Sequence, residues 1–225
     1  MSAIQAILEE IKHSPQLPDA IAELNAFWED EQRRRLQFYN DLDEDMKAEF
    51  IDGQVVMHSP AKDEHNLTRE LLSQVARTYA NENALGKARS EKALVKLRRN
   101  DFEPDMVFFG NEKAAAIEGK TLLYPAPDWV CEVLSPGTEQ YDRKVKFQDY
   151  AGNGVQEYWI IDPDKRVVEI YDLVDGHYEL RTKTSSGILE SIAIAGFAIP
   201  IEAIFDERAC TDTVMDIVHK ARGLK

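Results

Sequence analysis

Two carboxylates in apolar segments are the residues of this sequence most suited to joint chemistry. Asp105 follows Pro104 at the head of the apolar run 106–109, and Glu132 is the single carboxylate in the apolar run 129–134. A carboxylate in a buried strand needs compensation, because even a neutral polar group costs roughly 2–7 kcal/mol to bury unpaired. Paired carboxylates are the hard oxygen ligands that Mg²⁺ prefers. We therefore interpret the pattern as a site for a divalent metal that acts on a phosphodiester.

A lysine from the following segment completes the candidate group. Asp142 and Lys146 are four residues apart and would share one face of a helix. Each signal also has a structural alternative: Asp after Pro is common turn chemistry, Glu132 could form a buried salt bridge with Lys146, and Asp142 with Lys146 could be an ordinary surface ion pair. The residues alone leave these alternatives open.

The segments that must position these side chains have the pattern of an α/β (α+β) domain. Asp52-Gly53 supplies the positive φ angles of a tight turn and predicts a hairpin. Asp63 is predicted to be the N-cap of a helix through Tyr79, which places Glu64 and His65 in its first turn. Further strands are expected at 106–109, 129–134 and 157–162, and further helices at 139–150 and 211–222. Trp129, Tyr158 and Trp159 lie in apolar strands and are interpreted as core residues.

Residues 1–45 are predicted to form a helical N-terminal arm, and residues 46–225 the compact domain. Apolar residues recur at helical spacing in two sets, Ile4, Ile7, Leu8, Ile11 and then Ile21, Leu24, Phe27, Trp28. Residues 30–35 are highly charged, and the run Gln32-Arg-Arg-Arg35 within them is interpreted as a solvated helix face. An arm this apolar is expected to pack on the domain or on a second subunit, which predicts a homodimer or a higher homo-oligomer.

Composition limits the class of protein. With 225 residues, 44% hydrophobic and 30% charged, the chain is expected to be a soluble globular protein. No apolar run approaches the ~18 residues that span a bilayer, and the first residues lack a secretory signal pattern. Cys131 and Cys210 form no metal-binding pattern, so both are interpreted as reduced residues of a cytoplasmic protein.

The net charge of −14 argues against tight, nonspecific binding of nucleic acid. Basic residues gather only locally, between Lys87 and Arg99 and at Arg143, Lys144 and Lys146. A small basic patch on an acidic body is still compatible with transient contact with a nucleic acid substrate.

Several short motifs follow one another in a specific order: Asp52-Gly53, Ser59-Pro60, Glu64-His65, Pro104-Asp105, Glu132-Val-Leu-Ser-Pro136, Asp142 with Lys146, Tyr150, and Gly154-Val-x-Glu-Tyr-Trp-Ile-Ile-Asp-Pro163. In this order they resemble the Uma-type family of putative restriction endonucleases, which belongs to the PD-(D/E)xK nuclease superfamily. The resemblance covers roughly residues 47 to 205 and leaves the arm outside. The last block and Glu-Val-Leu-Ser-Pro are its most specific parts.

The resemblance implies a restriction-endonuclease-like mixed β-sheet flanked by helices and a metal-dependent endonuclease. Asp105, Glu132 and the backbone carbonyl of Val133 would hold Mg²⁺ or Mn²⁺. In the superfamily a catalytic lysine follows the second carboxylate by two residues, but that position is Leu134 here. The Uma-type pattern has a lysine on the following helix instead, which matches Lys146. This lysine would orient or deprotonate the attacking water.

Outer-shell roles are implied for Glu64, His65 and Asp142. The expected substrate is nucleic acid, DNA before RNA, and no membrane partner is expected. Two other functions stay open from the sequence. One is a nuclease fold that binds or assembles without cutting, which Leu134 and the acidic charge favour; the other is an oligomeric scaffold whose carboxylates only form buried ion pairs.

Overall fold

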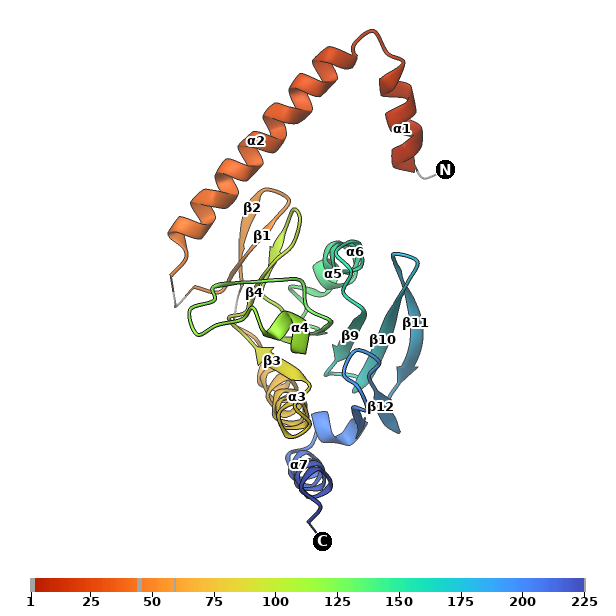
Figure 1. The fold of residues 1–225 in the computed structure, drawn as a ribbon. Helices are drawn as coiled ribbons and strands as arrows, with labels where there is room; N and C mark the ends of the chain where they lie inside the picture. The colour runs from red at the N-terminus through yellow and green to blue at the C-terminus, as the bar shows by residue number, and fades with distance from the viewer. Residues whose placement is uncertain (1–2, 44–45, 59, 225) are drawn as a thin grey trace.

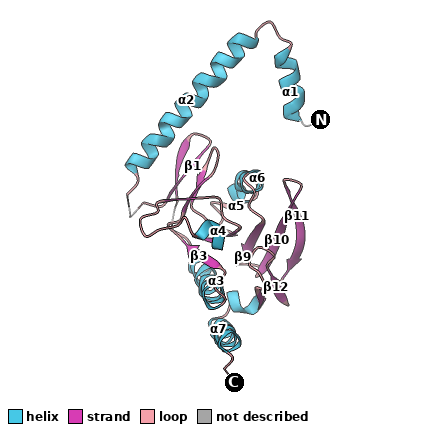
Figure 2. Cartoon of the chain, viewed as in Figure 1, coloured by secondary structure: helices cyan, strands magenta, loops and turns pink. Residues whose placement is uncertain are grey.

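The computed structural model describes residues 3–43, 46–58 and 60–224. The predicted domain boundary after residue 45 and the motif residue Ser59 fall outside the described residues. Figures 1 and 2 show a body of strands and helices from which one long N-terminal helix extends. The helices are α1 (Ala3–Lys12), α2 (Leu17–Asp41), α3 (Asp63–Glu82), α4 (Asn111–Ala114), α5 (Glu139–Asp142), α6 (Val145–Gly152) and α7 (Glu207–Arg222), with a 3₁₀ turn η1 (Ile201–Ile204).

The described strands form two large mixed sheets and one small ladder. The first sheet has the order β2-β1-β5-β4-β7, with bounds Gln54–Met57, Ala48–Ile51, Asp101–Phe102, Leu94–Lys96 and Leu123–Tyr124. The second has the order β11-β10-β9-β8-β6-β3, with bounds His177–Thr184, Val167–Val174, Glu157–Asp162, Trp129–Val133, Met106–Gly110 and Gly86–Ser90. The ladder pairs β12 (Ile188–Glu190) with β13 (Ala198–Pro200).

The mixed α/β class with a helical arm is confirmed, although the strands divide between two large sheets where one was expected. A single sheet was inferred because strand patterns in a sequence do not show which strands pair. The pairing that matters for the candidate site joins β6 to β8 in antiparallel register, with Met106 opposite Cys131. Strand β8 then pairs with β9 in parallel through the crossover α5–α6.

The central strands of the second sheet are buried on both faces, which explains their nearly continuous apolar sequence. One face packs on α3 and α7 through Trp129, Cys131 and Trp159. The other face, with Val130 and Leu134, packs on α6 and the first sheet. Glu132 shares the face of Val130 because side chains alternate along a strand. Its carboxylate is therefore directed into the layer between the two sheets.

Three predicted boundaries differ from the structure. The expected helix 139–150 is two short helices, α5 and α6, separated at Arg143 and Lys144. Lys62, with extended backbone, is the N-cap of α3, so Asp63 is its first helical residue rather than the cap. The final helix begins earlier than expected, at Glu207, because Asp206 caps it by accepting a hydrogen bond from the Ala209 amide. The hairpin at Asp52-Gly53 is confirmed, with φ of 49° and 78°.

Only the second half of α2 packs on the body of the protein. Phe38 stacks on Phe50 of β1 at 5.8 Å between ring centroids. Arg35 is buried and donates from Nε to Asp101 Oδ2 at 2.7 Å. The prediction that the run Gln32–Arg35 forms a solvated face is therefore wrong for Arg35, because a carboxylate of the distant strand β5 pairs with it.

Candidate active site between the two sheets

Asp105 and Glu132 lie side by side at the start of β6 and in the neighbouring strand β8. The Asp105 amide donates to Glu132 Oε2 at 3.3 Å, and the Val133 amide donates to Asp105 Oδ2 at 2.9 Å. Both side chains are buried. Antiparallel pairing of β6 with β8 thus brings together two carboxylates that are 27 residues apart in the sequence.

Cationic and hydrogen-bonding groups surround Asp105. His65 Nε2, from the first turn of α3, lies 3.2 Å from Asp105 Oδ2, and Lys47 Nζ lies 3.8 Å from Oδ1. Burial would raise the pKa of Asp105, but His65, Lys47 and the Val133 amide together hold that pKa below its ordinary value. Asp105 is therefore ionised at neutral pH. Glu64, the other candidate in this turn, is exposed and does not line the pocket.

Lys146 lies among three carboxylates. Its Nζ is 3.0 Å from Glu132 Oε1, 3.0 Å from Glu49 Oε1 and 3.3 Å from Asp142 Oδ1. Burial disfavours the ammonium charge, yet these carboxylates raise the pKa of Lys146 well above its usual value. Lys146 is therefore a fixed cation at neutral pH.

The structure brings Lys146 to the carboxylates from α6, as expected for a lysine of the following helix. Asp142, Lys146 and Tyr150 are all buried, whereas Lys144 is exposed. The ion pair of Asp142 with Lys146 is thus internal rather than on the surface. Leu134 is packed among apolar residues of the core, so it contributes no polar group to the site.

Glu132 is the least compensated carboxylate of the group. Burial, opposed by Lys146 and reinforced by the neighbouring carboxylates of Asp142, Asp105 and Glu49, raises the pKa of Glu132 to about 8. The Tyr150 hydroxyl donates to Glu132 Oε1 at 2.9 Å. The alternative of a buried contact with Lys146 is therefore present in the structure, but this contact does not offset the cost of burying a charge on Glu132, and the raised pKa favours its protonated form at neutral pH.

Glu49, His58 and Lys47 also belong to the site, and the sequence reasoning missed them. Glu49 in β1 is fully buried and accepts from the Glu103 amide at 2.9 Å, and His58 Nε2 lies 3.1 Å from Glu49 Oε2. A signal for Glu49 existed, since it is a lone carboxylate in the strand Ala48–Ile51, as Glu132 is in its own strand. That β1 lies across from β8 could not be read from the sequence.

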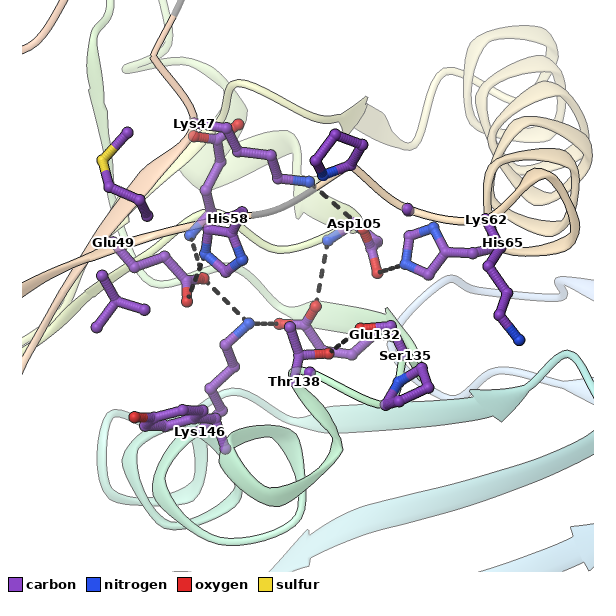
Figure 3. Close-up of a pocket in the computed structure, with 18 residues that line it drawn as sticks. Lys47, Glu49, His58, Lys62, His65, Asp105, Glu132, Ser135, Thr138 and Lys146 are labelled. Carbon is purple, nitrogen blue, oxygen red and sulfur yellow. Dashed lines mark hydrogen bonds and ion pairs between the residues drawn. The ribbon is translucent and has the colours of Figure 1, made fainter.

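These residues line one pocket of about 240 Å³ between the two sheets (Figure 3). Asp105, Glu132 and Lys146 reach it from the second sheet and α6, Glu49 and His58 from the hairpin, and His65 from α3. The Ser135–Thr138 turn that follows β8 closes another side. The pocket thus gathers four of the predicted site residues, His65 included, and the three that the sequence reasoning missed.

The donor set fits a divalent cation. Asp105, Glu132, Glu49 and Asp142 are carboxylates, and the Lys47 and Lys146 ammonium groups form ion pairs with them. Within the described part of the chain, no three His, Cys, Asp or Glu side chains are grouped as a ready-made metal cage. A site of one or two carboxylates completed by water and substrate oxygens is the usual arrangement for Mg²⁺. Such a cation would also stabilise the ionised form of Glu132, which Lys146 alone does not.

Three of the basic residues noted in the sequence are engaged within the chain. Lys87 donates to the Ala114 and Ile117 carbonyls, Arg99 pairs with Glu31, and Arg143 pairs with Glu169. These pairs stabilise loops and helix ends rather than presenting charge to a ligand. Among the described helices, none combines the length and the apolar character needed to cross a membrane.

This chain resembles one protein family in sequence and solved structures in fold. Residues 30–202 match the family described as "Uma2: Putative restriction endonuclease". A "putative nuclease belonging to DUF820" from Anabaena variabilis is structurally similar, with a TM-score of 0.64, 19% identity, and coverage of 75% of this chain and 94% of that one. The type IIG restriction endonuclease BpuSI aligns over 75% of this chain and 18% of its own, with a TM-score of 0.37 and 9% identity.

No curated protein matches the chain closely enough to count as a relative. The match to the family spans more than half of the chain and includes Asp105, Glu132 and Lys146. The similarity to the Anabaena protein shows a nuclease-like fold that extends over nearly all of that protein. This chain therefore belongs to the Uma2 family of putative restriction endonucleases.

Proposed function

We propose that this protein is a metal-dependent endonuclease that hydrolyses phosphodiester bonds in DNA. The observation that carries the proposal is a pair of buried carboxylates, Asp105 and Glu132, that line one pocket. The Lys146 ammonium group lies in the same pocket and contacts Glu132. The description of the family supports the reaction class and supports DNA as the substrate. The free, buried cysteines Cys131 and Cys210 fit a reducing compartment, the cytoplasm.

Asp105, Glu132 and the Val133 carbonyl would hold Mg²⁺ or Mn²⁺. The Val133 amide faces Asp105, and the carbonyl of a strand residue points to the same side as its amide. When bound, such an ion polarises a phosphate oxygen and makes water a better nucleophile at neutral pH. His65 and Lys47 keep Asp105 ionised and oriented, so this ligand is ready before the substrate arrives.

The proposed role of Lys146 is electrostatic. A lysine whose pKa is raised well above its ordinary value does not accept a proton from water at neutral pH. Its ammonium group can stabilise the negative charge that develops on the phosphate in the transition state. Of the two roles that the family resemblance allowed, orientation with charge stabilisation is the one that this environment supports, and deprotonation of the water is not.

The test is a cleavage assay with Mg²⁺ or Mn²⁺ on single-stranded, double-stranded and branched DNA, with RNA as a parallel substrate. We expect metal-dependent cleavage that Asp105→Asn and Glu132→Gln each reduce by at least about a thousandfold, or ~4 kcal/mol of transition-state stabilisation. Glu64→Gln is the matched control, because this carboxylate lies near the site but is exposed. Cleavage that survives both substitutions, or that needs no metal, would rule out the proposal.

One observation favours a second candidate, a nuclease-fold module that binds without cutting. Lys146 already pairs with three carboxylates, so its charge is engaged before any substrate is present. The net charge of −14 also disfavours stable contact with a polyanion. This candidate predicts that the protein binds Mn²⁺ but cleaves none of the substrates.

A further inference from the structure

One face of helix α2 carries a regular repeat, or stripe, along its length, apolar from Leu17 to Trp28 and charged at Glu31 and Arg35. Its members are separated alternately by four and three residues: Leu17, Ile21, Leu24, Trp28, Glu31, Arg35 and Phe38. A repeat averaging 3.5 residues keeps one face of a helix in contact with a neighbouring structure and is typical of helix-to-helix packing. The stripe thus predicts a partner for all of α2, not only for its end.

Within the described residues, only the second half of this stripe is buried. Glu31, Arg35 and Phe38 are buried against the body of the protein. Ile21, Leu24 and Trp28 on the same face are 49%, 59% and 44% exposed. Figure 1 shows the reason, since the first half of α2 extends beyond the strands that cover its second half. The same face of α2 therefore continues beyond its packed second half, and in the first half it is apolar and exposed.

The family match begins at residue 30, close to the point where the packing of α2 begins. The exposed half of α2 and all of α1 therefore precede the segment that this chain shares with its family. We name residues 3–30 the arm segment. Because it lies outside the nuclease-like domain and contributes nothing to the pocket, its apolar face needs an explanation separate from the candidate active site.

The arm segment exposes enough apolar surface for a stable interface. Helix α1 adds a second stripe with Ile4, Ile7 and Leu8, which are 69%, 56% and 45% exposed. Figure 1 shows α1 turning away from α2, so the two stripes do not cover one another. The large apolar side chains of the arm segment together present roughly 700 Å². That area approaches the ~800 Å² per partner of a standard protein interface.

The absence of charge beside the apolar half of the stripe, among the described residues, allows an identical partner. Ala20, Asn25 and Phe27 flank the stripe and carry no charge, whereas Glu23 and Asp30 lie on the other side of the helix. A basic partner would therefore find no acidic side chains beside the stripe. An acidic partner such as a second copy would meet no like charge there, despite the net charge of −14.

We infer that the arm segment binds the arm segment of a second copy of this chain and so forms a symmetric dimer. Two identical apolar stripes are self-complementary in an isologous contact, which is the commonest form of homodimer. The contact is remote from Asp105 and Glu132, so the inference does not depend on the proposed nuclease activity.

The test is the oligomeric state of the full chain, measured by light scattering and sedimentation equilibrium from about 1 to 100 µM. We expect the mass of a dimer. The double variant Leu24→Glu with Trp28→Glu should raise the dimer dissociation constant by at least about a hundredfold, because each lost side chain contributes several-fold to tenfold or more. Leu36→Glu is the matched control: this residue is 62% exposed on the same helix but lies off the stripe.

Circular dichroism melts verify that every variant is folded, which is expected since all substituted positions are exposed. A monomer mass for the wild-type chain over the whole concentration range would overturn the inference. A dimer that persists in the double variant, or that Leu36→Glu disrupts equally, would overturn it as well, because the contact would then lie elsewhere. A higher oligomer that the double variant reduces to monomers would support the arm contact.

Discussion

Glu49 Oε1 lies 3.0 Å from Lys146 Nζ, although the two residues are in the first hairpin and in α6. Glu49 also accepts from the Glu103 amide at 2.9 Å and lies 3.1 Å from His58 Nε2. These contacts fix the carboxylate, and the carboxylate in turn fixes the lysine beside Glu132. Despite burial, Lys146 and His58 hold the pKa of Glu49 below its ordinary value, so Glu49 is a permanent anion in this contact.

Glu49→Gln should therefore lower kcat with little change in KM. The amide keeps an oxygen for the Glu103 amide but removes one of the three charges that position Lys146, so the ammonium group would shift toward Glu132. We expect a loss of about 10- to 100-fold in kcat, equivalent to ~1.4–2.7 kcal/mol. Steady-state cleavage kinetics measure both constants. Glu49→Asp, which restores the charge, should recover part of the loss, and a rise in KM alone would argue against a positioning role.

Lys146→Met should destabilise the metal-free protein. Removal of the ammonium group leaves the carboxylates of Glu49, Glu132 and Asp142 buried without their shared cation. Breaking a buried ion pair from one side typically costs about 3–5 kcal/mol. Urea unfolding at neutral pH measures the change in free energy of unfolding.

Lys144→Met provides the internal comparison for this substitution. Lys144 is exposed two residues earlier in the chain. A change of less than about 0.5 kcal/mol is expected there, as for most surface substitutions. Equal losses of stability in the two variants would mean that the burial of Lys146 among three carboxylates does not stabilise the fold in the way described.

Mn²⁺ should raise the melting temperature of the wild-type protein. A ligand that binds only the folded state adds about 2.7 kcal/mol at a free concentration one hundred times its dissociation constant. Differential scanning fluorimetry with and without Mn²⁺ measures the shift. Asp105→Asn should remove most of this shift, whereas Glu64→Gln should retain it.

This measurement does not require turnover, so it separates the two proposed functions. A shift with cleavage supports the nuclease, and a shift without cleavage supports the module that binds but does not cut. An identical shift in wild type and Asp105→Asn would show that the cation binds somewhere other than at the carboxylate pair.

Glu169 should make stability sensitive to acid. Burial opposes its charge, but hydrogen bonds from Arg143 at 2.8 Å, Tyr171 at 2.6 Å and Lys183 at 2.9 Å lower the pKa of Glu169 to about 2. In the unfolded chain this pKa returns to about 4.3. The contribution to stability is therefore complete above about pH 4.3 and is lost as pH falls toward 2.

Glu169→Gln should cost about 1–2 kcal/mol at pH 7, a figure that allows for solvent screening of these half-exposed pairs. The difference between wild type and variant should shrink as the pH is lowered from 5 to 3. Urea titrations at several pH values measure it. A difference that stayed constant across this range would show that the charge on Glu169 is not what stabilises the strand.

The sequence determined the elements of this protein and the chemistry of its carboxylates. Asp105 at the head of one apolar strand and Glu132 within another indicated buried charge, and burial makes such charge costly enough to be informative. Helical spacing placed Asp142 and Lys146 on a shared face, and the structure showed that this face is buried. The Asp52-Gly53 turn was predictable because only a few residue types adopt its φ angles. These inferences succeed because they depend on residues that are close along the chain.

Only the tertiary structure decided how the strands are distributed between two sheets and which side chains meet between those sheets. Glu49 was as visible in its strand as Glu132, but nothing local shows that β1 faces β8, so its contact with Lys146 could not be predicted. Arg35 was misread for the same reason, because its charge is balanced by Asp101, 66 residues away. A local pattern shows that a buried charge needs a partner. The partner is supplied by long-range packing, which depends on the whole chain at once.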